Sequence, residues 1–171
     1  MGWNAPRTWV ADEIVSASTL NTHLRDNLSY LKSPAFAMTG VVTATILSAS
    51  ATTFTAIGQT VFNLTIAPQG DAVMVGGLIN VTTSGLFFDI GYSASGGSWW
   101  SAVGSAADAP SGLGQIDAAT RQRISLNHWV TGLSSASSYT FFPLWRSHFA
   151  TSAMQLYNSG VKNVFWVREV S

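Results

Sequence analysis

Cysteine is missing from this chain of 171 residues, and charge is scarce. Without cysteine, the chain has no disulfides, thiolate metal sites or thiol nucleophiles. Charged residues make up only 9% of the sequence, against an average near ~25%. Because solubility normally depends on surface charge, this composition favours an obligate oligomer over a monomer. The alternative is an ordinary neutral β domain whose polar surface comes from Ser, Thr, Asn and Gly.

Positive charge is also missing from a long stretch. Residues 33–120 contain no Lys or Arg, whereas residues 121–171 contain Glu169 as their sole acidic residue. The sequence therefore lacks the dense basic face that phosphate neutralisation requires, and we expect no nucleic-acid partner. No run approaches the ~18 apolar residues of a membrane span, and residues 1–10 lack the apolar core of a signal peptide. We expect synthesis in the cytoplasm and no membrane insertion.

One stretch, residues 9–34, predicts a helix. Ser16 or Ser18 can cap its first turn, and Pro34 stops it. At about 15 residues, such a helix is marginal in isolation, so packing must hold it. Its apolar side consists of leucines at spacings of four, four and three, which are Leu20, Leu24, Leu28 and Leu31.

We expect this helix to dock on other copies of the chain or on a larger particle, because one helix beside a β domain cannot bury both its faces. Residues 1–17 indicate an extended arm in which Trp3 and Trp9 have no local partner; folding back onto the same domain is the alternative. Asn27 lies beside the leucine stripe, where a buried amide fixes register in a coiled coil, or else it faces solvent. The predicted oligomerisation and anchoring residues are Trp9, Leu20, Leu24, Asn27, Leu28 and Leu31.

From Pro34 onward the hydrophobic pattern changes from helical to β. Many short strands without intervening helices imply a β-sandwich or jelly roll. The near-continuous apolar runs Val73–Ile79 and Val164–Val167 indicate strands covered on both faces, and in an oligomer a subunit interface covers the second face. Gly104–Ala119 is predicted to be a long loop, of a length often functional or ordered by a partner. Strands are predicted near 41–47, 52–57, 60–66, 72–82, 85–92, 98–103, 122–130, 138–146, 153–157 and 163–170.

No catalytic constellation stands out. The histidines are scattered without HxH or HExxH spacing, and there is no GxSxG elbow. A glycosidase needs two carboxylates, and the sequence offers Asp89, Asp108 and Asp117. Each of these residues is also explained by an ordinary position in a turn or at a strand edge. We therefore expect no enzyme, no catalytic residue, no metal and no cofactor.

Trp99 and Trp100 form the one suggestive binding feature. They follow a turn of small residues, Ser95-Gly96-Gly97-Ser98. Exposed aromatic rings beside small polar residues provide a platform for sugar rings or for side chains of a partner protein. The predicted contact of these rings is therefore with a sugar or with side chains of a partner. The alternative is that one ring packs in the core and the other in a subunit interface.

The helical stretch is similar to a motif of structural proteins of tailed bacteriophages. Those proteins open with a Trp-containing arm and the pattern W-x-x-x-E-x-V-x-A-x-x-L-N-x-x-x-R-D-N-x-x-x-L. The matching residues here are Trp9, Glu13, Val15, Ala17, Leu20, Asn21, Arg25, Asp26, Asn27 and Leu31. Residues 139–170 resemble the last strands of small trimeric jelly rolls related to tumour-necrosis-factor-like domains. The residues of that second resemblance are Trp145-Arg146 and Val167-Arg168-Glu169-Val170.

The resemblance implies a virion protein that forms a homotrimer, contacts other phage virion proteins and is made in the cytoplasm of a bacterial host. Residues 1–34 are then the attachment and oligomerisation segment, and residues 35–171 the β jelly roll. The leading prediction is a tail-fibre or tail-tip component that binds the host. A capsid decoration protein that stabilises the shell is the alternative, and a carbohydrate-binding module is a second one.

Overall fold

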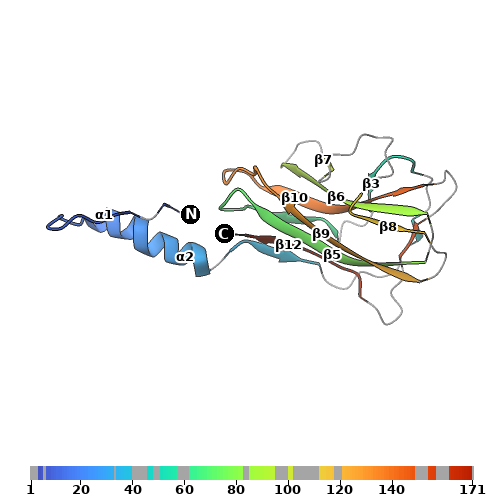
Figure 1. Cartoon of the computed structure of the whole chain (residues 1–171), viewed down its shortest axis with the longest axis horizontal. Coiled ribbons are helices and arrows are strands. Elements are labelled where there is room, and N and C mark those ends of the chain that lie inside the picture. Colours follow the sequence, from blue (N-terminus) through green and yellow to red (C-terminus); the bar gives the residue numbers. More distant parts are fainter. Residues whose placement is uncertain are drawn as a thin grey trace.

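The fold is mainly β, with one helix ahead of antiparallel sheets. In this computed structural model, the helix projects from one end of the β domain, and both ends of the chain lie toward that side (Figure 1). The mainly-β prediction is therefore confirmed. The structure describes residues 4–5, 7–32, 34–39, 46–47, 51–57, 62–82, 85–94, 100–101, 112–117, 121–148, 154–156 and 162–170.

The helix has three sections, α1 (Ala17–Leu20), the π-helical η1 (Asn21–Asp26) and α2 (Asn27–Lys32). Its start agrees with the sequence, because the Ser16 side chain caps the first turn by accepting a hydrogen bond of 3.1 Å from the Thr19 N–H. The π-helical section was not predicted. Such sections are rare and occur frequently at functional sites.

Three of the long strands, β5, β6 and β10, are central in their sheets, whereas β9 is a long edge strand. The strand β9 coincides with the predicted strand at 122–130, while two others were missed. One is β1, directly after the helix, and the other is β8, inside the predicted loop Gly104–Ala119. The strands are β1 (Phe36–Met38), β2 (Ile46–Leu47), β3 (Thr55–Ala56), β4 (Leu64–Ile66), β5 (Val73–Val81), β6 (Leu86–Ala94), β7 (Trp100–Ser101), β8 (Gly114–Ile116), β9 (Gln122–Val130), β10 (Tyr139–Ser147), β11 (Met154–Gln155) and β12 (Val164–Glu169).

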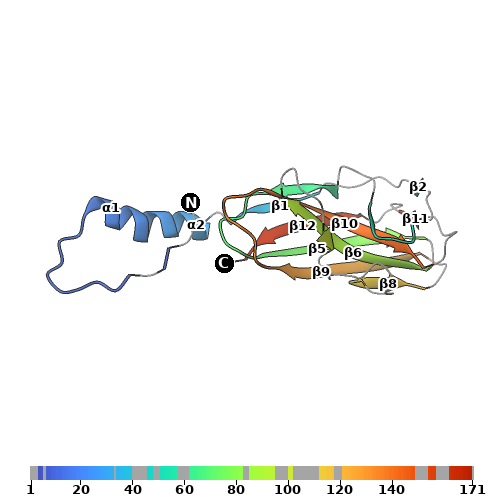
Figure 2. The same ribbon diagram turned by 90° about the horizontal axis from the view of Figure 1, so that it is seen from above.

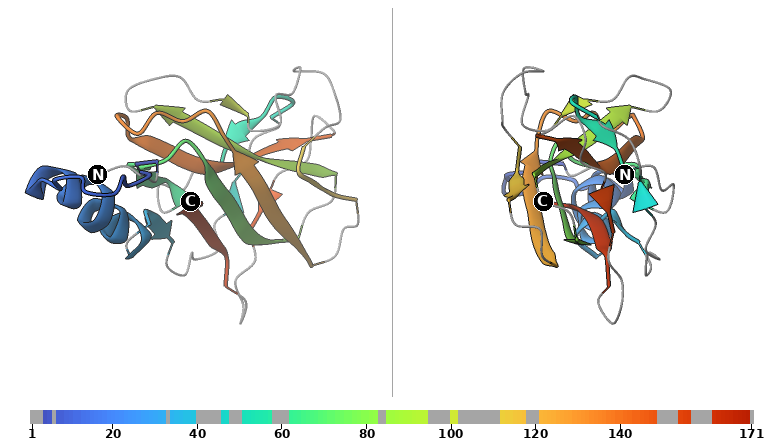
Figure 3. Two further views of the ribbon diagram at one scale, coloured as in Figure 1. Left: turned by 60° about the vertical axis from the view of Figure 1, so that its left-hand side comes forward. Right: turned by 90° about the vertical axis from the view of Figure 1, so that its right-hand side faces the viewer.

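The long strands form two antiparallel sheets that share one hydrophobic core. The first sheet has the order β1-β12-β5-β9. The second has the order β3-β10-β6-β7, with β4 also paired to β10 and β8 paired to β6. Fully buried side chains from both sheets, such as Val75 and Phe165 from one and Phe88 and Phe141 from the other, belong to the same core. This arrangement is that of a β-sandwich (Figures 2 and 3).

The outer faces of the two sheets differ. On the second sheet, Phe142 and Leu144 point away from the core and are nevertheless buried. The guanidinium of Arg146 lies 5.0 Å from the centre of the Phe87 ring and 5.5 Å from the centre of the Phe54 ring. Phe54 and Arg146 therefore cover part of this face. On the first sheet, by contrast, large apolar side chains remain exposed. The prediction that Val73–Ile79 is covered on both faces therefore fails within a single chain.

A buried carboxylate joins the end of the helix to the sandwich. The Glu169 side chain, 2% exposed at the end of β12, accepts hydrogen bonds from the N–H groups of Ala35 (2.9 Å), Gln69 (2.7 Å) and Gly70. The Glu169 N–H in turn donates to the Ala35 carbonyl at 2.8 Å. Because Ala35 directly follows the proline that ends the helix, this clamp fixes the point at which the helix leaves the sheet.

Candidate functional site

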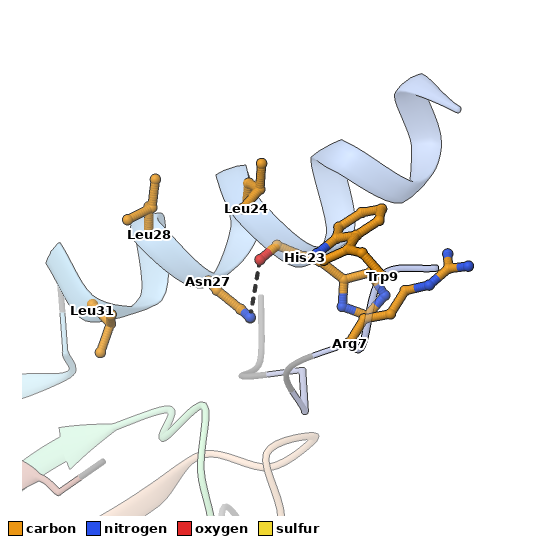
Figure 4. A pocket seen from close by; sticks show the side chains of 7 residues that line it. All are labelled: Arg7, Trp9, His23, Leu24, Asn27, Leu28 and Leu31. Atoms are coloured by element: carbon orange, nitrogen blue, oxygen red, sulfur yellow. Dashed lines mark hydrogen bonds between the residues drawn. The ribbon is translucent and has the colours of Figure 1, made fainter. Parts of the chain in front are cut away.

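The candidate site is a hollow of about 310 Å³ between the N-terminal segment and the helix. Figure 4 shows the side chains around it. Most of the predicted anchoring residues meet here, whereas Leu20 lies one turn earlier and is not part of the lining. The lining residues are Arg7, Trp9, His23, Leu24, Asn27, Leu28 and Leu31.

Asn27 holds the N-terminal segment against the helix. Its side-chain oxygen accepts a hydrogen bond from the Asn4 N–H at 2.9 Å, and its Nδ2 donates to the Asn4 carbonyl at 3.0 Å and to the His23 carbonyl at 3.3 Å. Asn27 is 7% exposed, so the solvent-facing alternative is wrong. Its hydrogen bonds are made within one chain, and its role in fixing the register of an oligomer stays a prediction.

The segment before the helix folds back along it (Figure 2). A turn at Ala11 and Asp12 reverses its direction, with Asp12 in the left-handed region at φ 62°. Trp9 lies edge-on to His23 with ring centres 6.4 Å apart, and the Arg7 guanidinium is 5.2 Å from the Trp9 ring centre. Arg7 also forms an ion pair with Glu13. The expectation that Trp9 lacks a local partner is therefore wrong, although its side chain stays half-exposed.

The leucine stripe is only partly covered by the residues that the structure describes. Exposed fractions are 41% for Leu20, 51% for Leu24, 65% for Leu28 and 55% for Leu31. Complete burial of one leucine side chain contributes about 1.5–3 kcal/mol. A partner that covers these residues therefore gains a substantial part of that free energy at each position.

His23 adds a polar requirement to this apolar hollow. Its Nδ1 is buried and has no hydrogen-bond partner among the residues that the structure describes. Buried polar atoms are nearly always paired. The His23 ring lines the hollow, but this nitrogen has almost no accessible surface, so a partner in the hollow reaches it only if the ring or the N-terminal segment shifts.

The other predicted contact residues lie elsewhere. Trp100 begins β7, which pairs with β6 at Tyr92, while Trp99 and the Trp100 side chain fall outside the described part of the chain. Their role in binding a receptor stays a prediction. Within the described ranges, no three His, Asp or Glu residues are grouped so as to hold a metal ion. No helix in those ranges has the length and hydropathy of a membrane span.

Replacing Asn27 with Ala is expected to release the N-terminal segment. The substitution removes two hydrogen bonds to Asn4, each worth about 0.5–1.5 kcal/mol, so tryptic cleavage after Arg7 should accelerate roughly tenfold. Mass spectrometry of a digestion time course measures the rate. Asn21→Ala, an exposed change on the same helix, is the matched control. An unchanged rate in Asn27→Ala would show that other contacts hold the segment.

A scan against protein-family models finds no match for this chain, and a search of curated proteins finds no similar sequence.

Proposed function

We propose that this protein is a structural, non-enzymatic component of a tailed-bacteriophage particle. In this role, residues 1–34 attach the chain to neighbouring subunits and virion proteins, and the β domain is presented outward. The observation that carries the proposal is the projecting helix, whose four leucines stay 41–65% exposed beyond the end of the sandwich (Figure 1). The phage-like motif spans the same helix and the segment folded against it.

We further propose that the β domain is a jelly roll and that the protein is a homotrimer. The strand order supports the first point, because β12 lies between β1 and β5 while β10 lies between β4 and β6. Such crossing connections between two antiparallel sheets are typical of jelly rolls. The low charge and the uncovered leucines support self-association, and the resemblance to small trimeric jelly rolls gives the number of copies.

The proposed location of the protein is the tail fibre or tail tip. There, Trp99 and Trp100 are the proposed contacts to a host glycan or protein. The number of copies per virion, measured by quantitative gel staining, distinguishes this location from capsid decoration. A few trimers per particle indicate the tail. A copy number that matches the symmetry points of the capsid lattice indicates decoration of the shell.

Deleting residues 1–34 is expected to abolish incorporation into particles. The deletion removes the leucine stripe and the folded-back segment but none of the core residues of the sandwich. The measurement is the amount of protein that co-sediments with purified virions when the variant is supplied to a phage that lacks its own copy. Full-length Asp71→Ala, which changes an exposed carboxylate of the β domain, is the control. Undiminished co-sedimentation of the truncated protein would overturn the attachment role.

A further inference from the structure

The outer face of the first sheet carries an apolar surface that the described part of the chain leaves largely exposed. Its most exposed large side chains are Phe36 (58%), Met38 (57%), Trp129 (50%) and Leu78 (38%). They come from β1, β9 and β5, and Met74 of β5 and Trp166 of β12 lie half-buried among them. We call these six residues the open face.

The strand register makes the open face continuous. Phe36 pairs with Arg168, Arg168 with Met74, and Met74 with Trp129, which gives one row of side chains across all four strands. Met38, Trp166, Gly76 and Asn127 form the next row. Neighbouring side chains on one face of a sheet are about 5 Å apart, so Met74 lies beside Trp129 and Met38 beside Trp166, while Arg168 stands between Phe36 and Met74.

Gly76 allows the Trp166 ring to lie across the sheet. A Cβ atom at Gly76 would lie 2.5 Å from Cζ2 of Trp166 and 2.7 Å from Oδ1 of Asn127. The space above Gly76 is therefore filled by the indole edge and the amide. The Trp166 ring therefore adds apolar surface over β5 as well as over its own strand.

The chemistry of this face is that of a protein interface. Aromatic residues, Met and Arg are enriched at such interfaces, whereas Lys, Glu and Asp are depleted. The outward positions of these four strands include Arg123 and Arg168, and none of them is Lys, Asp or Glu. On the second sheet, by contrast, the apolar outward side chains Phe87, Phe142 and Leu144 are buried by the chain itself, so an uncovered apolar sheet face is not a general property of this fold.

The available area indicates what covers the open face. Half-exposed aromatic and long apolar side chains expose on the order of 100 Å² each, so the four most exposed residues together contribute roughly 400 Å². A stable protein interface needs about 800 Å² from each partner. The leucine stripe of the helix contributes a further area of roughly 350 Å². Neither surface reaches the required area alone, but the two together come close to it.

We propose that the open face is a self-association surface that faces the symmetry axis of the oligomer and packs against neighbouring copies of this chain, with all copies in parallel orientation. The helix leaves the sandwich at the Phe36 end of the sheet, because Phe36 directly follows Ala35. Copies whose open faces meet side by side with parallel axes therefore bring their leucine stripes together at the same end. This inference rests on the self-association in the proposed function but not on the assignment to a phage.

The test compares full-length Trp129→Glu and Leu78→Glu with the unchanged protein by sedimentation equilibrium. Both residues are exposed in the single chain, so the substitutions leave the core intact; far-UV circular dichroism checks the fold. A carboxylate buried in this interface would be desolvated without a partner, and we expect the dissociation constant to rise at least about 100-fold. Asn63→Glu, an exposed change directly before β4 of the other sheet, should leave the dissociation constant unchanged within about twofold.

Three results would overturn the inference. If both open-face variants keep the oligomer while helix variants lose it, the open face is not part of the interface, and the proposed self-association still holds. If the unchanged protein is a monomer of 18.2 kDa at micromolar concentration, the open-face inference and the proposed trimer both fail. If Trp129→Glu keeps the oligomer but loses binding on a glycan array, the face takes a sugar instead of another copy.

Discussion

Replacing Glu169 with Ala is expected to lower the free energy of unfolding by about 3–5 kcal/mol. The carboxylate accepts hydrogen bonds from the N–H groups of Ala35, Gln69 and Gly70 in a site that is 2% exposed. Its removal leaves these three backbone donors without their acceptor. Each unsatisfied buried donor costs about 1–3 kcal/mol, and water that enters the vacated space offsets part of this loss.

Urea denaturation followed by tryptophan fluorescence measures the change, at one protein concentration because self-association raises apparent stability. Glu169→Gln keeps one carbonyl oxygen but turns an amide N–H₂ toward the other donors, so it should lose an intermediate amount. Asp71→Ala removes an exposed carboxylate near the same loop and should change stability by less than about 0.5 kcal/mol. A loss below about 1 kcal/mol in Glu169→Ala would show that the clamp contributes little.

The Glu169 clamp also shows why part of the fold was not predictable. Glu169 bonds to backbone groups 134 and 100 residues away in sequence. In the sequence, it is one carboxylate on a terminal strand, and nothing local indicates that it turns inward. The helix start, by contrast, followed from a serine cap, and β9 followed from apolar and polar residues between clear breakers. Local signals therefore predicted these local features, and the long-range contact required the structure.

The two missed strands have a common physical reason. β1 and β8 contain only three residues each, and neither sequence, FAM or GQI, belongs to a longer run of β-branched or aromatic residues. β8 is also preceded by glycine-rich sequence that favours a loop. Each is held by pairing with a longer strand, since β1 pairs with β12 and β8 with β6. Their β structure comes from the partner strand and not from their own propensity.

The candidate site was predicted in its residues but not in its arrangement. The spacing of the leucines indicated the exposed stripe, and Trp9 and Asn27 were singled out as contact residues. The sequence did not show that the N-terminal segment reverses at Asp12 and bonds to Asn27 in the same chain. Trp129 was also missed, because a tryptophan in a predicted strand is expected to point toward the core.

Replacing Leu24 and Leu28 together with Asp is expected to raise the dissociation constant of the oligomer at least about 1,000-fold. The two side chains are 51% and 65% exposed in the single chain, so each can bury substantial further area in a complex. Burial of a complete leucine side chain is worth about 1.5–3 kcal/mol, and two desolvated carboxylates add a further penalty. Since 1.4 kcal/mol of binding free energy corresponds to a factor of ten, the combined loss raises the dissociation constant by more than three orders of magnitude.

Asn21→Asp combined with Ser29→Asp is the matched control, because it places the same two charges at exposed polar positions of the same helix. Sedimentation equilibrium should show this control unchanged within about threefold. Helicity measured at 222 nm then separates loss of the interface from loss of the helix, since carboxylates near a helix C-terminus are unfavourable in both variants. If the leucine variant assembles as well as the control, the stripe does not bind other copies.

Combining Leu28→Asp with Trp129→Glu tests whether the helix and the open face belong to one interface. If both surfaces bind the same neighbouring copy, either substitution alone removes most of the binding free energy. Adding the second substitution then lowers the binding free energy by less than it does in the otherwise unchanged protein. If they bind different partners, the two losses of binding free energy add within about 0.5 kcal/mol. Because the helix leaves the sheet beside Phe36 and is fixed there by Glu169, we expect coupling. Glu169→Gln should weaken that coupling, since it loosens the junction that aligns the two surfaces.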